Sequence, residues 1–463
     1  MKTALLLALA LLAPAPPPQD TSLADALDAA VKAYRPRDGI LGVSVHSVRA
    51  GAPVYASRAD EPLLLASNTK LLTTAAALLR LGPDYRFRTL LAVADQDVHV
   101  FGAGDPNISG RFHDGDPTAV FKRWAAKLKA AGIPTFRHLV LHTGVFEGPS
   151  LNPGWKDYEA WRWYVAPFAP LSLNDNCVDV TIEPGREGDP VKVTLSPDTN
   201  YARVVVQAKT ARRPSRPLII QRAADAAVIT LKGETGARDT YPVAVPDPTL
   251  FFGTVLLETL AREGVRCTGA LQESAASAEE VPGLREIDVF ESPLPRTLAA
   301  CNGPSQNFYA EMILRVLGWR AKGKGTLENG LAAVREALEG LGLASLRQAD
   351  GSGLTRENRC SPGDLVKLLL HMRAHPAFVE SLAVNGAETG TLRRRLTHPE
   401  LRGRVRAKTG HIQGVSSLSG YVEAFNGETY VFSVVANALN TGEADRLQDR
   451  LCELLIRHRG DGK

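Results

Sequence analysis

Three short groups of residues combine hydroxyl, amine and amide groups at spacings that suit acyl transfer. The first group is Ser67-Asn68-Thr69-Lys70. Residues three apart on a helix share a face, so the Lys70 amine can reach the Ser67 hydroxyl. A lysine accepts the serine proton only where its surroundings lower its pKa from ~10.4 toward ~7–8. By itself this pair would also fit a helix cap at Ser67 and a solvated Lys70.

The second group is Ser305-Gln306-Asn307, which follows Asn302-Gly303-Pro304 and precedes a helical stretch. On a turn, the Ser305 hydroxyl and the Asn307 amide can both point into one cleft. There Ser305 can pass a proton to a leaving amine, while Asn307 can hold Lys70 and a substrate amide. Taken alone, the group would also fit an ordinary helix N-cap.

The third group is Lys408-Thr409-Gly410, which we expect to head the strand before a hairpin. Gly410 lets a substrate backbone approach, Lys408 supplies positive charge, and a strand edge binds extended peptides. In isolation, such a motif more often marks a basic strand end that faces solvent. All three groups in this order are a far more specific signal than any one of them.

The two ends of the chain carry the elements that must position these groups. The pattern predicts a helix over 23–34 and strands over 42–48 and 54–56 near the start. Near the end, two strand-like runs, 419–425 and 429–435, flank Asn-Gly, a strong hairpin signal, and an apolar helix follows. We therefore predict an α+β fold with one antiparallel sheet built from both ends of the chain.

The middle of the chain reads as a mostly β insertion. Short strand-like runs dominate residues 91–289, and only 121–131 and 250–263 look firmly helical. After the insertion, helical patterns return over three stretches: 307–317, 327–341 and 362–373. The predicted organisation is a catalytic domain in two parts, 19–90 and 290–463, interrupted by an insertion of one or two small modules at 91–289.

Length and composition exclude several classes of protein. The chain has 463 residues, 44% hydrophobic and 22% charged, with a net charge of +4. This balance is that of a folded protein, the length exceeds one hydrophobic core, and the charge is too weak to indicate a nucleic-acid partner. The chain has five cysteines, which are widely spaced and form no C-x-x-C pair: Cys177, Cys267, Cys301, Cys360 and Cys452. We therefore expect mostly free, buried thiols, and we expect no metal site.

The N-terminus indicates export. Met1-Lys2 precedes an apolar run from Ala4 to Ala13, and a proline-rich stretch follows. A run of that length is too short to cross a hydrocarbon core of ~30 Å as a helix. We expect residues 1–18 to be a secretory signal peptide, and the mature protein to be periplasmic or otherwise extracytoplasmic, with at most peripheral membrane association.

With these residues in place, the chain resembles the penicilloyl serine transferases, which include penicillin-binding proteins and serine β-lactamases. It is most similar to the class C low-molecular-mass penicillin-binding proteins, the D-alanyl-D-alanine carboxypeptidase/endopeptidases of the penicillin-binding protein 4 type. That group has a large insertion between its first two motifs, and here 235 residues separate Lys70 from Ser305. Further segments carry the resemblance: Gly102–Pro106, Asn174–Cys177, Asp350–Asn358, Gly390–Arg395 and Gly414–Ser416.

The resemblance implies a β-lactamase/transpeptidase-like catalytic domain and a role for each motif residue. Ser67 would be the acylated nucleophile, with Lys70 as its base. Ser305 and Asn307 would form the opposite wall, and Lys408 the third side. The substrate-binding residues implied are Thr409, Gly410 and His411.

The resemblance also implies an oxyanion hole made by the backbone N–H groups of Ser67 and His411. His411 departs from the family pattern, because many members have Ser or Thr there to hold the terminal carboxylate of the substrate. Some DD-carboxypeptidases of a neighbouring class carry His at this position. Carboxylate anchoring, and with it the preference between carboxypeptidase and endopeptidase action, therefore stays open.

The implied function is hydrolysis of D-Ala-D-Ala and D-Ala–diaminoacid bonds in peptidoglycan stem peptides through an acyl-Ser67 intermediate. β-Lactam antibiotics would acylate the same serine, and no metal or organic cofactor would be needed. One alternative is a serine β-lactamase, although no E-x-x-L-N stretch suggests a dedicated deacylation glutamate. Another is a catalytically silent wall-binding protein, although none of the three motifs is degenerate.

Overall fold

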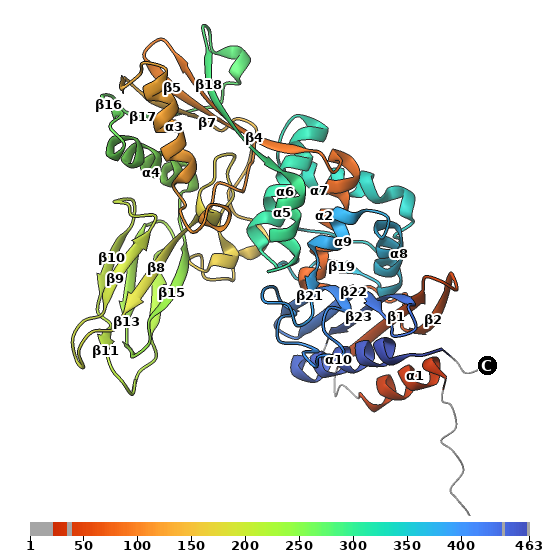
Figure 1. The fold of residues 1–463 in the computed structure, drawn as a ribbon. Helices are drawn as coiled ribbons and strands as arrows, with labels where there is room; N and C mark the ends of the chain where they lie inside the picture. Colours follow the sequence, from red (N-terminus) through yellow and green to blue (C-terminus); the bar gives the residue numbers. More distant parts are fainter. Residues whose placement is uncertain (1–21, 35–38, 438–439, 461–463) are drawn as a thin grey trace, which may run out of the picture.

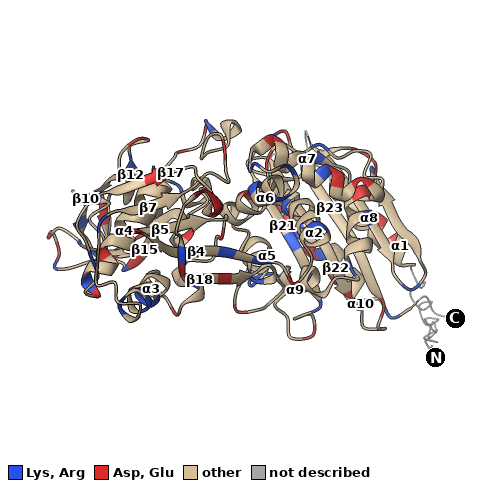
Figure 2. Cartoon of the chain, turned by 90° about the horizontal axis from the view of Figure 1, so that it is seen from above, with Lys and Arg blue, Asp and Glu red and all other residues tan. Residues whose placement is uncertain are grey.

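The computed structural model describes residues 22–34, 39–437 and 440–460. The predicted signal peptide, residues 1–18, lies outside the described residues. The chain forms two lobes, one built from its two ends and one from its middle (Figure 1). Acidic and basic side chains are interspersed over both lobes (Figure 2), as the weak net charge suggests. No helix in the described part of the chain combines the length and apolar character needed to cross a bilayer.

A six-stranded antiparallel sheet organises the first lobe. Its first and last segments in sequence are neighbours, because β1 pairs with β23. The order across the sheet is β2 (Ala52–Ser57), β1 (Ile40–Ser47), β23 (Thr429–Asn437), β22 (Val415–Glu423), β21 (Val405–Ile412) and β20 (Ala383–Val384). The predicted sheet from both ends of the chain, and with it the α+β fold class, is confirmed.

Helices cover both faces of this sheet. On one face, α1 (Leu23–Ala33) and α10 (Thr441–Arg457) bury their apolar stripes against β1, β22 and β23. On the other face lies a helical core with α2 (Thr69–Leu81) at its centre. Around α2 pack α5 (Leu294–Asn302), α6 (Asn307–Lys322), α7 (Leu327–Leu338), α8 (Pro362–Met372) and α9 (Pro376–Ser381).

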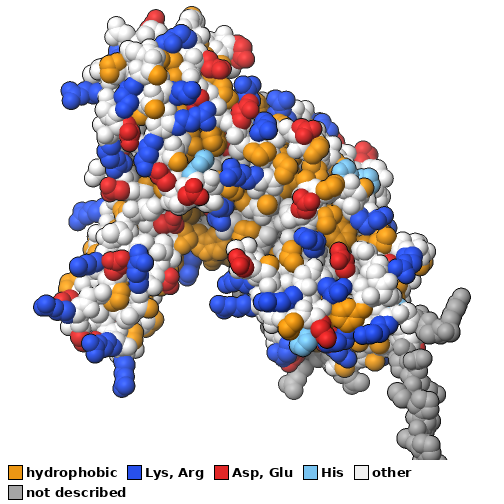
Figure 3. All heavy atoms as spheres, in the orientation of Figure 1, with side chains coloured by type: hydrophobic (Ala, Val, Ile, Leu, Met, Phe, Trp, Pro, Cys, Tyr) orange, Lys and Arg blue, Asp and Glu red, His pale blue; other side chains and the backbone are white. Residues whose placement is uncertain are grey.

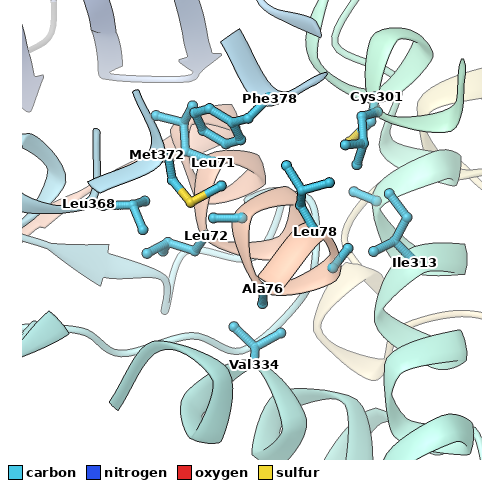
Figure 4. Close-up of a cluster of buried hydrophobic side chains, with 14 of the residues drawn as sticks. Leu71, Leu72, Ala76, Leu78, Cys301, Ile313, Val334, Leu368, Met372 and Phe378 are labelled. Carbon is cyan, nitrogen blue, oxygen red and sulfur yellow. The ribbon is translucent and has the colours of Figure 1, made fainter. Parts of the chain in front are cut away.

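The helix that carries the first motif is almost entirely enclosed. Residues 69–78 of α2 are all buried. Figure 4 shows its side chains Leu71, Leu72, Ala76 and Leu78 ringed by residues of the surrounding helices. Close packing of this kind resists displacement, so the residues at the start of α2 have a rigid base.

The second lobe has its own hydrophobic core. A five-stranded sheet packs against α3 (Ala119–Ala130) and α4 (Pro248–Arg262) in the order β17 (Leu271–Ser274), β7 (Leu139–His142), β5 (Asp97–Gly102), β4 (Arg86–Ala94), β18 (Arg285–Pro293). The lobe also has two three-stranded sheets. The order in the first is β15 (Asp239–Ala244), β8 (Cys177–Glu183) and β9 (Lys192–Ser196). The order in the second is β10 (Arg203–Val206), β13 (Val228–Lys232) and β12 (Ile219–Arg222).

Strands β4 and β18 pair with each other and join the two lobes. The domain limits at residues 91 and 289 stay predictions. Strand β4 begins before the first limit, at Arg86, and strand β18 ends after the second, at Pro293. The remaining strands are two-residue pairs: β3 (Leu63–Leu64) with β19 (Arg359–Cys360), β6 (Thr135–Phe136) with β16 (Arg266–Cys267), and β11 (Lys209–Thr210) with β14 (Glu234–Thr235).

The structure differs from the predicted elements in two details. Lys408-Thr409-Gly410 does not head its strand, because β21 begins at Val405 and its first residues already pair with β22. The first motif begins in a 3-10 turn, η1 (Ala66–Asn68), and only then enters α2. The five cysteines are free thiols and four of them are buried, as expected.

Candidate active site

Ser67 and Lys70 meet where η1 passes into α2. The Lys70 ammonium nitrogen, Nζ, lies 2.8 Å from the Ser67 hydroxyl oxygen, Oγ. Lys70 is completely buried, whereas Ser67 is half-buried. The nucleophile predicted from the sequence is therefore reachable by a ligand, and the predicted base is shielded behind it.

Two further oxygen atoms surround the Lys70 amine. Nζ donates to the Asn307 side-chain oxygen at 2.7 Å and to the Ser352 backbone carbonyl at 2.8 Å. Burial lowers the pKa of Lys70 to about 8, although nearby Cys301, Asp350 and Glu311 oppose that shift. A neutral amine has two N–H groups and one lone pair. These match two carbonyl acceptors and one hydroxyl donor, which leaves Lys70 fully bonded in its uncharged form.

The second motif sits at the start of α6. Ser305 has a φ of +65°, a left-handed conformation that sets its side chain apart from the helix that follows. Asn307 is held by donating from its amide to the Tyr164 carbonyl at 2.8 Å. The Ser305 hydroxyl accepts a hydrogen bond from the Lys408 amine at 2.8 Å, so the second and third motifs are in direct contact.

Lys408 is the second completely buried lysine of the site. Its Nζ donates to the Ser305 hydroxyl and to the Thr409 backbone carbonyl, both at 2.8 Å. Burial and, after it, the charge of Lys70 hold the pKa of Lys408 well below its usual range. Two positive charges behind one cleft repel each other, which favours the neutral form of at least one.

Gly410 allows β21 to lie directly against η1. A Cβ at this position would come within 2.2 Å of the Ser417 hydroxyl, 2.6 Å of the Leu65 carbonyl and 3.0 Å of the Ser67 nitrogen. Asn68 ties the same two segments by donating to the Lys408 carbonyl at 3.1 Å. Any larger residue at 410 would push the strand away from the serine.

The other two substrate-binding candidates lie on the outer side of β21. The Thr409 hydroxyl donates to the Thr391 hydroxyl at 2.8 Å. The His411 side chain is exposed, with its Nε2 3.4 Å from the Thr441 hydroxyl. Sequence reasoning gave no role to Thr391, yet its contact with Thr409 makes it part of this wall.

A loop that the sequence reasoning did not assign to the site supports Lys70 from behind. Asp350 accepts hydrogen bonds from the backbone N–H groups of Gly353 and Thr355, at 2.6 and 2.7 Å, and from the Asn358 amide at 2.9 Å. Gly353 has a φ of +86°, and a Cβ there would lie 1.8 Å from the Ala66 carbonyl. The loop is thus locked against the turn that carries Ser67.

Glu311 is the other residue that sequence reasoning missed. It is completely buried, and its Oε1 accepts from the Gly351 N–H at 2.9 Å. Burial raises its pKa to about 8, and the charge of Asp350 adds to this shift. Glu311 lies one helical turn beyond Asn307 on α6. The i,i+4 spacing places both side chains on one helix face, but the sequence alone does not show that Glu311 is buried.

These groups surround one cavity of about 480 Å³, here called the Ser67 cavity. Five of the predicted residues line it, whereas Lys70, Lys408 and Gly410 lie behind its wall. Figure 3 shows the surface hollowed where the two lobes meet, with hydrophobic side chains at the junction. The cavity is lined by Ser67, Tyr158, Trp163, Tyr164, Pro304, Ser305, Asn307, Gly353, Leu354, Thr391, Thr409, His411 and Ile412.

Sequence comparisons point to one family. Residues 23–457 match the D-Ala-D-Ala carboxypeptidase 3 (S13) family. A D-alanyl-D-alanine carboxypeptidase of Actinomadura sp. (strain R39) is 31% identical over 95% of this chain and 85% of its own length. The D-alanyl-D-alanine carboxypeptidase DacB of Haemophilus influenzae is 26% identical, over 83% of this chain and 82% of its own.

Solved structures agree on the fold. Penicillin binding protein 4 from Haemophilus influenzae superposes with a TM-score of 0.76, at 21% identity, over 92% of this chain and 97% of that chain. The Bd3459 endopeptidase from Bdellovibrio bacteriovorus superposes with a TM-score of 0.51, at 17% identity, over 90% and 93%. Together with the match along residues 23–457, this places the chain in the D-Ala-D-Ala carboxypeptidase 3 (S13) family.

Proposed function

We propose that the protein is a serine DD-peptidase that hydrolyses D-Ala-D-Ala and D-Ala–diaminoacid bonds of peptidoglycan through an acyl-Ser67 intermediate. Membership of the S13 family supports the activity. The observation that carries the mechanism is the Lys70 amine, buried and 2.8 Å from the Ser67 hydroxyl, with its two N–H groups directed to carbonyl oxygens.

Acylation follows from this geometry. Neutral Lys70 takes the proton of Ser67 as its oxygen attacks the carbonyl carbon of the penultimate D-Ala, and a tetrahedral oxyanion forms. The predicted oxyanion donors, the N–H groups of Ser67 and His411, belong to η1 and β21, which Gly410 brings into contact. Asn307 keeps Lys70 in place through its side-chain oxygen.

The opposite wall serves the leaving group. Ser305 accepts from Lys408 through its oxygen, so its own hydroxyl proton is available to the departing amine. The amine leaves carrying that proton. The proton that Lys70 took from Ser67 then restores the Ser305 hydroxyl, which leaves Lys70 neutral again. Water then attacks the acyl-Ser67 ester, with Lys70 again as base, and releases the shortened peptide.

β-Lactams are expected to acylate Ser67 in the same way, because their strained amide presents the same carbonyl to the nucleophile. Penicillin binding protein 4 from Haemophilus influenzae, which shares the fold, has been solved with a β-lactam. The substrate is extracytoplasmic, and the basic and apolar N-terminal residues support export and at most peripheral membrane association.

Labelling with a fluorescent penicillin tests the proposal. The purified protein should be labelled stoichiometrically, Ser67→Ala should not be labelled, and the exposed Ser150→Ala should match the wild type. Failure of the wild type to be labelled would contradict a functional acylating serine. Fast, continuous nitrocefin turnover would instead indicate a β-lactamase.

Mass spectrometry of muropeptides after digestion of intact wall separates the two bond types. Loss of crosslinked dimers shows endopeptidase action, and loss of terminal D-Ala alone shows carboxypeptidase action. An unchanged muropeptide profile from a protein that penicillin labels would contradict the peptidase assignment.

A further inference from the structure

A second cavity, of about 440 Å³, adjoins the Ser67 cavity and is here called the Asp179 cavity. Trp163 lines both cavities and is 37% exposed, which is unusual for a large hydrophobic side chain in this protein. Gln306, between Ser305 and Asn307 in the sequence, lines only the second cavity. The two cavities therefore lie on either side of the Ser305 segment and share one aromatic wall.

Most charge in the Asp179 cavity is satisfied within the protein. Arg111, on η2 (Gly110–Phe112), pairs with Asp175, on η5 (Asn174–Asn176), at 2.5 Å. The other Asp175 oxygen accepts from the Tyr309 hydroxyl of α6 at 2.7 Å. Asp175 thus has both oxygens occupied and contacts the other lobe through Tyr309, while Arg111 is paired with Asp175.

Asp179, on β8, is different. Its Oδ2 accepts from the Asn174 amide at 3.1 Å, and the described residues provide its Oδ1 with no further hydrogen bond or ion pair. Burial raises the pKa of this carboxyl, with Asp175 adding to the effect. One half-satisfied carboxylate thus stands in the wall of a cavity next to the reacting serine. Such a group accepts a charge-assisted hydrogen bond from an amide N–H.

The two bond types that this enzyme would cleave differ in their leaving groups. A D-Ala-D-Ala end loses a single amino acid, whereas a crosslink loses a whole second stem peptide. That peptide departs on the Ser305 side, where the proton donor to the leaving amine lies. Space for it is needed beyond Ser305, and the Asp179 cavity occupies that position. Its volume is within the range of peptide and small-ligand sites.

Resting on the proposed function, we propose that the Asp179 cavity is the binding site for the second, leaving stem peptide of a crosslinked pair. Asp179 accepts a hydrogen bond from a backbone N–H of that peptide. Trp163 packs against its aliphatic side chain at the passage between the two cavities.

Asp179→Asn is a direct test, because the amide keeps the shape of the side chain and removes the charge. The asparagine keeps a side-chain oxygen that can accept the hydrogen bond from the Asn174 amide, so the variant should fold normally. The exposed Asp189→Asn, close to the N-terminal end of β9, is the matched control. Each protein is assayed on a crosslinked muropeptide dimer, on a monomeric pentapeptide ending in D-Ala-D-Ala, and for acylation by labelled penicillin.

We expect Asp179→Asn to lose about tenfold in kcat/KM on the dimer, mainly through KM, and less than twofold on the pentapeptide and in penicillin acylation. An unchanged dimer rate, or equal losses on all three substrates, would overturn the inference. So would a wild type that releases D-Ala from pentapeptides but leaves dimers intact. A wild type that penicillin does not label would instead refute the proposed function itself.

Discussion

The two buried lysines of the site, Lys70 and Lys408, face the same cleft but are held differently. Lys70 has three oxygen partners, one on the preceding turn and two from distant segments: Ser67, Asn307 and Ser352. Lys408 has two, and one of them is the carbonyl of its own neighbour, Thr409. Both are completely buried, so burial alone does not distinguish them.

The two amines differ in the hydrogen-bonding capacity that their protein partners leave unused. Lys70 is fully bonded as a neutral amine, and its one lone pair faces the Ser67 hydroxyl. Lys408, when charged, keeps a third N–H beyond its two partners, and a substrate carboxylate or carbonyl can accept it. We infer that Lys70 moves protons and Lys408 binds and polarises. The predictions below test that division of roles.

Replacing Lys70 should have the largest effect. Lys70→Met fills the same buried volume without an amine, so the protein should fold while Ser67 loses its base. We expect the second-order rate constant for penicillin acylation to fall by roughly 10³-fold or more. Stopped-flow acylation kinetics measure it, with circular dichroism as the check on folding. A loss below tenfold would mean that another group takes the serine proton.

Lys408→Met should cost less, about 10- to 100-fold in acylation, since the proton path from Ser67 to Lys70 survives. The loss should be greater for substrates that carry a terminal carboxylate than for the same peptides as amides. If Lys70→Met and Lys408→Met lose the same factor on both kinds of substrate, the two lysines do not have separate roles.

The pH profile should follow Lys70. Its pKa is lowered to about 8, and only the neutral form can accept the proton. The neutral fraction therefore falls about tenfold for each pH unit below 8. Penicillin acylation should rise with pH along a limb of unit slope and level off above about 8. An acylation rate independent of pH from 6 to 9 would exclude Lys70 as the titrating base.

Glu311 tests the support behind Lys70 rather than the lysine itself. Its pKa is raised to about 8, so the folded protein holds a proton that the unfolded chain releases above about 4.5. The stability of the wild type should therefore decline as pH rises from 5 to 8. Glu311→Gln removes this pH dependence and should therefore gain about 3–4 kcal/mol of unfolding free energy over the wild type at pH 8 relative to pH 5.

Urea unfolding of the wild type and Glu311→Gln at both pH values measures that difference. The exposed Glu336 of α7, tested as Glu336→Gln, is the control, because its hydrogen bond with Lys322 lowers its pKa instead of raising it. The same gain at pH 5 and at pH 8 for Glu311→Gln would show that the carboxyl does not titrate in this range.

The smallest effect is expected at the outer wall. Thr391→Val keeps the shape of the side chain but removes the hydroxyl that accepts from Thr409. This hydrogen bond affects Lys408 only indirectly, through the backbone of β21. We therefore expect a two- to fivefold rise in KM with kcat little changed. Steady-state kinetics on a pentapeptide measure both. A change confined to kcat would place Thr391 in the chemistry rather than in substrate positioning.

Sequence reasoning found the parts of the site that depend on local spacing. Ser67 and Lys70 are one turn apart on a helix, and Ser305 and Asn307 flank one turn. The Ser352 carbonyl could not be found, because every residue has a carbonyl and only the tertiary fold selects one. Glu311 was hidden because a lone acid on a helix usually faces solvent, and only packing buries it.

The same distinction applies to the fold. The paired strands at the two ends were predictable from their alternation and from the Asn-Gly turn. The position of Lys408 within β21 was not, because the start of a strand depends on pairing with β20 and β22 rather than on its own sequence. The Asp179 cavity could not be predicted from the sequence either, because it forms from segments far apart in the chain.

The pairing of β1 with β23 has a consequence for assembly. Val43 lies opposite Val434, so the sheet that supports Lys408 closes only when the last strand arrives. Contacts between such distant segments form late, because the long intervening chain must first be ordered. Ser67 and Lys70 are neighbours in the sequence, whereas the wall that carries Lys408 depends on β22 and β23. The complete cleft therefore requires the last strand of the sheet.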